Sequence, residues 1–404
     1  MIQIQKKQDC CGCHACAQIC PKHCITMQPD AEGFLYPNID ESACIDCGSC
    51  EKVCPIIHST REPSNRKPMA YAAMNLDENI RLASSSGGVF TLLAEQTIDK
   101  GGIVFGAAMS EDQHSVHHIA VETKTGLTAL RGSKYLQSAI GDTYLQARKA
   151  LWHGRKVLFS GTPCQIEGLR TFLQKDYPNL FCVDLICHGV PSPLVWDTYL
   201  TEQEKSAGAP ARRTFFRHKK YGWKTFAVLL EFANNTAYER VASADTFMQA
   251  FLRNACLRPS CYACHFKKMN RVSDITLADY WGIQNQYPEM NDNKGISLVL
   301  VHSEKGQCCL NELGHFSHLK SVPVAQALIN NPAMCCSVRA HKHRRQFFSH
   351  LGRMSFSKLV ATYARDEIPI RRIILCYLKS IGLEPLIRAL KNMKKKMRLH
   401  KDDA

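Results

Sequence analysis

One cysteine pattern occurs twice near the start of this 404-residue chain and restricts how that region can fold. The pattern is C-x2-C-x2-C-x3-C-P, with cysteines at Cys10, Cys13, Cys16 and Cys20 and again at Cys44, Cys47, Cys50 and Cys54. This spacing is typical of proteins with two [4Fe-4S] clusters, in which the fourth cysteine of each run binds the other cluster. We therefore predict one cluster on Cys10, Cys13, Cys16 and Cys54, and a second on Cys44, Cys47, Cys50 and Cys20. Cys11 and Cys24 are assigned to neither.

Zinc is the alternative, because paired C-x2-C motifs also build tetrahedral zinc sites. Two identical runs that both end in Cys-Pro favour the clusters. A module of residues 1–58 has room for only a small core, so the metal should supply much of its folding free energy.

The cysteine content also bears on the cellular compartment. The chain has 21 cysteines, and ten of them lie between Cys10 and Cys54. The N-terminal residues include no apolar stretch of the kind found in secretory signals, so we expect reduced thiols and a cytoplasmic location. No run approaches the roughly 18 to 20 apolar residues that cross a bilayer.

The formal net charge of +15 comes mostly from residues 339–404, which hold 17 Lys and Arg against 5 Asp and Glu. This tail has an amphipathic end, with Leu386, Leu390, Met393 and Met397 at helical spacing. It could pack on the protein itself, bind a partner or make peripheral contact with an anionic membrane. We expect no nucleic acid partner, because the net positive charge is concentrated in the tail, which lacks interleaved aromatic residues.

Alternating helix and strand patterns follow the cysteine module. Helices are predicted at 89–97 and 144–153, and strands at 103–109, 116–122, 157–160, 180–187, 214–217, 226–232, 275–278 and 296–302. The later strands have few helices between them, which indicates a mixed sheet. We predict an α+β or α/β fold with a two-cluster module (1–58), a linker (59–68), a mixed-sheet α/β core (69–330) and a basic helical tail (331–404).

A second group of cysteines lies in the predicted core. Its members are Cys164, Cys187, Cys256, Cys261 and Cys264. Cys164 and Cys187 each follow a predicted strand, so both could lie at one edge of the sheet, and the C-x2-C pair can bind one metal centre from a single turn. A third [4Fe-4S] cluster is the preferred interpretation. The alternatives are small buried cysteines, or a nucleophilic Cys164 activated by His188.

A Ser-Gly segment precedes the predicted helix at 89–97. Ser85, Ser86, Gly87 and Gly88 there could hold the pyrophosphate of a flavin at the helix N-terminus, and Ser133 and Lys134 could contribute to the same site. An ordinary Ser-capped helix and a basic surface turn are the alternatives. We expect His114, His117 and His118 to be solvated.

Seven segments in this order resemble the bacterial branch of the coenzyme F-420 hydrogenase/dehydrogenase beta-subunit family, preceded by a ferredoxin-type domain. The segments are SSSGGVFT, GSKYLQS, LFSGTPCQIEGL, DLICHGVPSP, FFRHKKYGWKTF, CLRPSCYACHF and SDITLADYWGI. The resemblance spans most of residues 1–305 and implies an oxidoreductase with FAD and a further [4Fe-4S] cluster. It implies Cys164, Cys187, Cys261 and Cys264 as the ligands of that cluster, with Cys256 as a substitute.

The resemblance also implies electron exchange between a one-electron donor such as ferredoxin and a two-electron acceptor. His188 is the predicted proton donor, since imidazole exchanges protons near neutral pH. Bacterial relatives are often linked with polysaccharide biosynthesis, so the acceptor is expected to be a small molecule or a glycan intermediate. No feature indicates a site for the deazaflavin coenzyme. The alternative is a non-catalytic electron-transfer subunit that serves a separate enzyme.

Overall fold

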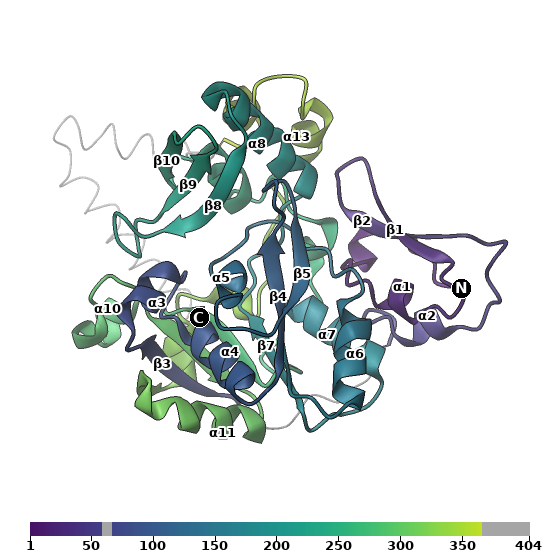
Figure 1. Cartoon of the computed structure of the whole chain (residues 1–404). Coiled ribbons are helices and arrows are strands. Elements are labelled where there is room, and N and C mark those ends of the chain that lie inside the picture. Colours follow the sequence, from purple (N-terminus) through teal and green to yellow (C-terminus); the bar gives the residue numbers. More distant parts are fainter. Residues whose placement is uncertain (59–66, 366–404) are drawn as a thin grey trace, which may run out of the picture. The chain divides into compact units, whose positions relative to one another are not determined.

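The computed structural model describes residues 1–58 and 67–365 (Figure 1). The chain divides into two compact units, Met1–Ala364 and Arg365–Ala404, and nearly all of the second lies outside the described residues. The predicted amphipathic end of the tail and most of the predicted linker also lie outside them. None of the helices in the described ranges has the length and hydropathy needed to span a lipid bilayer.

The cysteine module is built from short elements around its cysteines. These elements are η1 (Lys7–Asp9), α1 (Ala15–Ile19), the antiparallel strands β1 (Ile25–Pro29) and β2 (Leu35–Ile39), and α2 (Ser49–Lys52). His14 and Gly48 occupy equivalent places before the two helices and both have left-handed backbones, with φ of 63° and 69°. The sequence repeat is therefore also a repeat of local backbone geometry.

An eight-stranded sheet forms the centre of the body, in the order β13-β3-β12-β11-β7-β6-β4-β5. Its strands are β3 (Met69–Asn75), β4 (Ile103–Met109), β5 (Val116–Val121), β6 (Val157–Ser160), β7 (Leu180–Leu185), β11 (Ile275–Asp279), β12 (Ser297–Val301) and β13 (Ser317–Val322). The strands β4, β6, β7 and β11 run parallel, and the outer pairings are antiparallel. The prediction of a mixed-sheet α/β fold is confirmed.

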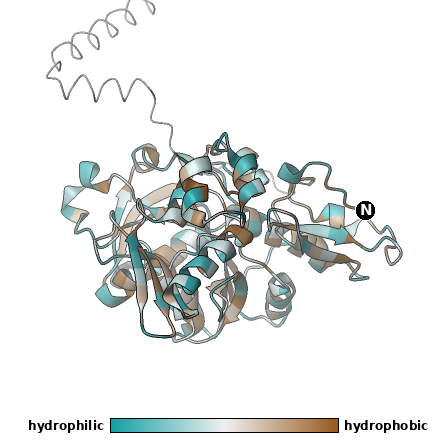
Figure 2. Ribbon diagram, turned by 90° about the horizontal axis from the view of Figure 1, so that it is seen from above, coloured by the Kyte–Doolittle hydropathy of each residue, from teal (hydrophilic) through white to brown (hydrophobic). Residues whose placement is uncertain are grey.

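Helices cover both faces of this sheet, because neighbouring strand residues point in opposite directions. Phe105 and Phe159 pack with α6 (Thr143–Trp152) and α7 (Pro163–Leu173). On the other face, Val104 and Leu158 pack with α4 (Val89–Asp99) and α11 (Glu304–Glu312). Apolar segments run through the interior while polar turns of the outer helices face outward (Figure 2). The parallel strands thus end at one edge, which is where α/β folds place their sites.

A smaller antiparallel sheet lies beside this edge and has its own core around Trp196. Its strands are β8 (Ala211–His218), β9 (Ala227–Phe232) and β10 (Ala237–Val241). Packed around it are α8 (Pro193–Ala207), α9 (Thr246–Leu252), α13 (Arg344–His350) and α14 (Phe356–Tyr363). The remaining short helices are α3 (Glu78–Ala83), α5 (Leu127–Leu130), η2 (Pro259–Ala263), α10 (Ile283–Gln286), η3 (Pro288–Met290), η4 (Leu313–His315), α12 (Val324–Leu328) and η5 (Pro332–Met334).

Candidate functional site

Two separate cavities in the N-terminal module each collect one of the predicted cysteine sets. The first, called the proximal set, is Cys10, Cys13, Cys16 and Cys54. The second, called the distal set, is Cys20, Cys44, Cys47 and Cys50. The structure therefore brings together the two sets that the crossed ligand pattern predicts, although ligation itself stays a prediction.

The chemistry of both sets fits [4Fe-4S] clusters. All eight cysteines are free thiols, and most are buried, whereas Cys47 of the distal set is exposed. Burial raises the pKa of Cys16 well above its ordinary value, so an uncharged cavity disfavours the thiolate and a bound metal centre would favour it. Within residues 1–58 and 67–365, no three Cys, His, Asp or Glu side chains converge on a point that could hold a single metal ion.

Cys24, which the sequence leaves unassigned, borders the distal cavity. Its Sγ lies 3.3 Å from Sγ of Cys20. A fifth thiol therefore stands beside the four predicted ligands.

A third cavity collects the four predicted cysteines of the body, Cys164, Cys187, Cys261 and Cys264. Cys164 lies in the first turn of α7, which begins just after β6 ends, and Cys187 follows the end of β7. Because β6 and β7 are parallel, their carboxyl ends meet at one sheet edge, as the sequence predicts. Cys261 lies in η2 and Cys264 directly follows it, so the C-x2-C pair closes the same cavity from the other side.

Two alternative assignments receive no support from the geometry, namely Cys256 as a cluster ligand and Cys164 as a nucleophile activated by His188. Cys256 is fully buried in the core of the smaller sheet and does not line the third cavity. Sγ of Cys164 lies 3.1 Å from the hydroxyl of Thr162, while Nε2 of His188 lies 2.7 Å from Oδ1 of Asn254. Among the described residues, Cys164 thus has no imidazole hydrogen-bonded to it.

Cys11 is the residue that joins these cavities. It lines the proximal cavity, the third cavity and the large cavity described below. Its thiol interacts with those of Cys13 and Cys164, and the interaction with Cys11 lowers the pKa of Cys164 below its ordinary value. Only its position in the tertiary structure reveals this role, because Cys11 falls outside the repeated motif.

The module is held against α7 by close contacts. The hydroxyl of Thr171 donates to the carbonyl of Val53 at 2.7 Å. Gly168 faces Cys13 so closely that an added Cβ would lie 2.7 Å from Cβ of Cys13 and 2.9 Å from its Sγ. The proximal set is therefore packed directly on the body of the protein.

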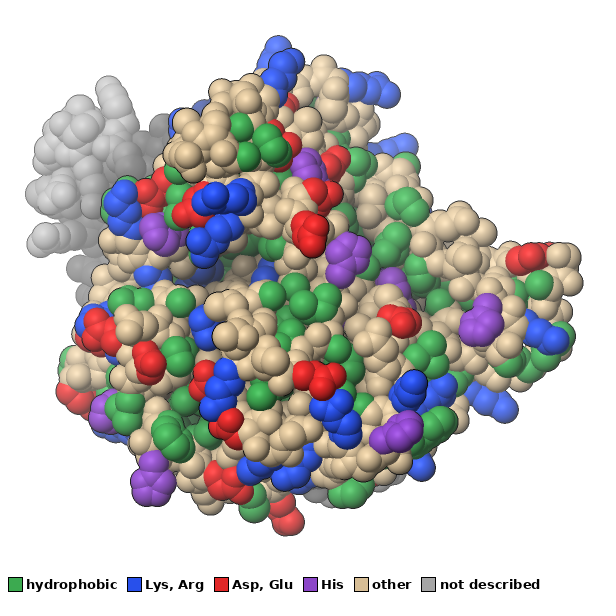
Figure 3. Space-filling model, in the orientation of Figure 1, with side chains coloured by type: hydrophobic (Ala, Val, Ile, Leu, Met, Phe, Trp, Pro, Cys, Tyr) green, Lys and Arg blue, Asp and Glu red, His purple; other side chains and the backbone are tan. Residues whose placement is uncertain are grey.

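A large cavity of about 630 Å³ opens at the same edge of the sheet. The space-filling view shows the molecule hollowed between the smaller sheet and the part that carries α3 and α4, with basic side chains inside the hollow (Figure 3). Of the predicted flavin and catalytic residues, Ser85, Ser86, Gly88, Ser133, Lys134 and His188 line this cavity. Cys164 and Cys187 line it too, so the third cavity and the large cavity share a wall.

Gly87 is the one predicted flavin residue that does not line the cavity. An added Cβ would lie 2.4 Å from the carbonyl oxygen of Ala73, and the Gly87 amide donates to Oγ of Ser297 at 3.0 Å. It packs the Ser-Gly loop onto β3 and β12.

The two predicted phosphate segments lie side by side. Both the backbone amide and the hydroxyl of Ser133 donate to Oγ of Ser85, at 2.7 and 2.8 Å. Gly88 directly precedes α4 with a φ of 82°, which favours glycine. The Lys134 ammonium donates to the carbonyls of Ala129 and Arg131, and burial lowers its pKa to about 7.

The expectation that His118 is solvated is wrong. His118 is 6% exposed and lines the large cavity, whereas its neighbour His117 is exposed on the opposite side of β5. Burial lowers the pKa of His118 to about 4, so the ring is neutral and its Nε2 donates to the carbonyl of Ser160 at 3.0 Å. Its buried Nδ1 has no hydrogen-bond partner among the described residues. Strand alternation was the signal that could have separated the two histidines.

Arg217 is a further cavity residue that the sequence does not single out. It pairs with Asp279 at the end of β11 at 2.8 Å, and its guanidinium lies 4.1 Å from the ring centroid of Phe226. The large cavity thus combines a helix N-terminus, basic side chains, aromatic walls and a buried imidazole nitrogen that has no hydrogen-bond partner among the described residues. These features fit an anionic aromatic cofactor such as a flavin nucleotide.

Two segments of the chain match models of known protein families. Residues 9–56 match the 4Fe-4S dicluster domain, which supports iron–sulfur clusters in the N-terminal module. Residues 154–326 match the C terminus of the coenzyme F420 hydrogenase/dehydrogenase beta subunit. The resemblance stated from the sequence is therefore confirmed over these residues, which are similar to the C-terminal part of that beta subunit.

One similar solved structure is the xenon derivative of the F420-reducing [NiFe] hydrogenase complex from Methanosarcina barkeri. The identity is 15%, the alignment covers 68% of this chain and 92% of that chain, and the TM-score is 0.47. The comparison with curated proteins found no match.

Proposed function

We propose that this chain is an iron–sulfur flavoprotein oxidoreductase that moves electrons between one-electron carriers and a two-electron acceptor or donor. One observation carries the proposal: the proximal, third and large cavities share walls in series. Cys11 borders the proximal cavity and the third cavity, while Cys164 and Cys187 border the third cavity and the large one. Electron transfer needs such closely spaced redox sites, so the series supports a path from the module to the large cavity.

The residues have distinct roles in this proposal. The distal set, the proximal set and the four body cysteines would each hold one [4Fe-4S] cluster. Ser85, Ser86, Gly88, Ser133 and Lys134 would bind the pyrophosphate of FAD. Bound FAD would supply the exchange between single electrons and a hydride.

His188 is our candidate for holding and delivering a proton in the large cavity. Its ring packs against Phe251 with centroids 5.2 Å apart, and the hydrogen bond to Asn254 fixes its orientation. Burial lowers its pKa, so the ring is mostly neutral near pH 7 and can accept a proton. If His188→Ala left steady-state reduction unchanged while the cofactors stayed bound, this role would be wrong.

The proposed partners follow from the two ends of the proposed electron path, which are the distal set and the large cavity. The exposed Cys47 and the neighbouring Ile45, which is 58% exposed, make the distal set the natural contact for a one-electron donor such as ferredoxin. The acceptor at the large cavity would be a small molecule or a glycan intermediate of polysaccharide biosynthesis. We propose a cytoplasmic protein without a nucleic acid partner. Peripheral membrane contact of the tail is testable by liposome sedimentation with and without residues 366–404.

Cofactor stoichiometry tests the proposal. The full chain would be purified anaerobically and its clusters reconstituted, and iron, acid-labile sulfide and released flavin would be measured per chain. About twelve iron atoms and one FAD support it. About eight iron atoms without flavin would refute it and favour a non-catalytic electron-transfer subunit.

Acceptor reduction by the isolated chain with an artificial electron donor separates the same two functions. A flavoprotein enzyme should reduce a two-electron acceptor alone. An electron-transfer subunit should be silent until its partner enzyme is added.

A further inference from the structure

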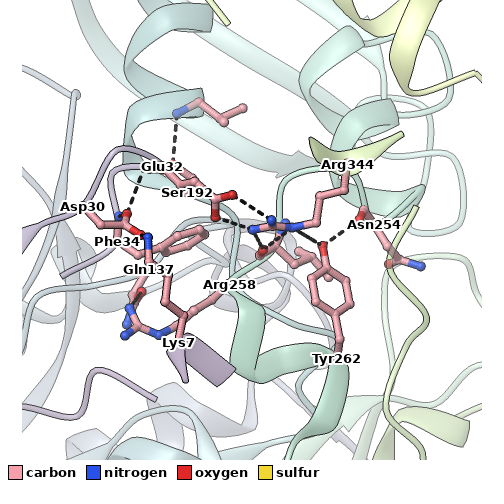
Figure 4. A network of polar contacts seen from close by, with 12 residues as sticks. Lys7, Asp30, Glu32, Phe34, Gln137, Ser192, Asn254, Arg258, Tyr262 and Arg344 are labelled. Carbon is pink, nitrogen blue, oxygen red and sulfur yellow. Dashed lines mark hydrogen bonds and ion pairs between the residues drawn. The ribbon is translucent and has the colours of Figure 1, made fainter. Parts of the chain in front are cut away.

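Arg258 connects the body to the ligand loop of the proximal set. It follows Cys256 and Leu257, directly before η2, and its side chain is fully buried. Its Nε donates to the carbonyl of Cys10 at 2.8 Å, and Nη2 donates to the carbonyl of Leu35 at 3.0 Å. Figure 4 shows Arg258 and Arg344 reaching toward the module residues Phe34 and Glu32. Arg258 is therefore a contact across the junction of module and body.

The same guanidinium also reaches a predicted cluster ligand. Nη2 of Arg258 lies 3.5 Å from Sγ of Cys10, and the guanidinium carbon lies 4.3 Å from the ring centroid of Tyr36. No carboxylate of residues 1–58 or 67–365 forms an ion pair with Arg258, although the buried Arg217 and the partly buried Arg344 both have one. A buried charge is costly unless an opposite charge lies near it. Four thiolates on a [4Fe-4S] cluster would supply that negative charge.

The chain makes room for this contact. Gly12 lies between Cys10 and Cys13 with a φ of 67°, and an added Cβ would lie 2.9 Å from Nη1 of Arg258. It would also lie 2.6 Å from Nε2 of Gln137, whose Oε1 accepts from Nη1 of Arg258 at 3.0 Å. Glycine thus lets the guanidinium approach the backbone of the ligand loop.

We propose that Arg258 is a positioning residue that raises the reduction potential of the cluster on the proximal set. A positive charge and a hydrogen bond to a ligand sulfur both favour the state with one more electron, so both raise the potential. A higher potential at the proximal set would favour the transfer of an electron from the distal cluster to the proximal cluster, which lies nearer the body. The inference rests on the two N-terminal clusters of the proposed function and requires neither FAD nor the third cluster.

Arg344 provides a matched control. It forms a two-fold ion pair with Glu32 of the module, at 2.8 and 2.6 Å, and donates to the carbonyl of Leu257 in the body at 2.8 Å. Among the described contacts it touches no cysteine sulfur. Both Arg258→Met and Arg344→Met remove hydrogen bonds that link the module to the body. Only Arg258→Met also removes the contact with Sγ of Cys10.

The experiment is a redox titration of the full-length, anaerobically reconstituted protein followed by electron paramagnetic resonance. Cys47→Ser identifies the signal of the distal cluster, which also serves as an internal reference. Loss of a charge-assisted hydrogen bond should change the ratio of reduced to oxidised proximal cluster by roughly tenfold at a given potential. That corresponds to about 59 mV for one electron.

We expect the proximal potential to fall in Arg258→Met and to stay unchanged in Arg344→Met, with the distal potential constant in both. Unchanged potentials in Arg258→Met with full iron content would overturn the proposal, and so would equal shifts in both variants. If Arg258→Met loses the proximal iron, Arg258→Lys is titrated instead, because it keeps the charge but not the planar group. A smaller fall of the proximal potential supports the proposal, and none overturns it. Missing flavin or body-cluster iron would instead count against the proposed function alone.

Discussion

Gly168 provides the sharpest test of how the module is held on the body. It lies inside α7, where alanine normally stabilises a helix by about 1 kcal/mol relative to glycine. Its backbone has no left-handed conformation that would exclude alanine. A change in α7 alone would therefore make Gly168→Ala slightly more stable than the natural protein.

The contact with Cys13 reverses this expectation. The new Cβ would lie 2.7 Å from Cβ of Cys13, an atom that cannot move without its backbone, and 3.1 Å from the hydroxyl of Tyr144. Overpacking of this kind costs about 1 to 3 kcal/mol. When the gain in helix propensity is subtracted, we expect the free energy of unfolding to fall by up to about 2 kcal/mol. The weakened contacts are mainly those between α1 and α7.

The assay is thermal unfolding of the anaerobic holoprotein, with cluster absorbance reporting on the module and far-ultraviolet circular dichroism on the whole fold. We expect cluster loss at a lower temperature in Gly168→Ala. Gly314→Ala is the control, because an added Cβ there meets no atom within 4 Å. If Gly168→Ala kept its iron and lost its clusters no earlier than the natural protein, the packing argument would be wrong.

Three further predictions concern acid stability and the metal centres. Burial lowers the pKa of His302 to about 3, so only the unfolded chain takes up this proton as the pH falls below 6.5. His302 alone should therefore lower the free energy of unfolding by about 2 kcal/mol between pH 7 and pH 5. His302→Gln should reduce the loss of stability on acidification by that amount in urea titrations. Cys256→Ala should retain all iron, whereas Cys261→Ala should lose about four iron atoms per chain by chemical analysis, and equal losses would contradict the third-cavity assignment. Chelation of iron should unfold residues 1–58 first, seen as proteolysis confined to the module, and simultaneous loss of the body would oppose a metal-dependent module.

Local patterns in the sequence were enough to predict much of the fold. Strand periodicity located β4 and β6 correctly, because consecutive apolar residues there are buried on both faces of the sheet. The short strands of the module and β3 were not predicted, since a run such as Met69–Asn75 is mostly alanine and methionine and carries little strand preference. His117 and His118 are neighbours in a predicted strand, so alternation predicts that they face opposite sides, and the orientation of β5 in the fold decides that His118 is the buried one.

The sequence by itself predicted the cluster chemistry of the N-terminal cysteines, because ligand spacing within one short segment is a local property. It also indicated the resemblance to the beta-subunit family, through seven motifs in a fixed order. Only the tertiary structure decided that Cys11 stands between two sets of cysteines, that Arg258 reaches Cys10 and that Gly168 faces Cys13. Those contacts join residues far apart in the chain, and the packing of the module on α7 and on the loop before η2 creates them. Spacing along a chain cannot encode which distant surfaces meet, since that is decided by the burial and hydrogen bonding of the whole fold.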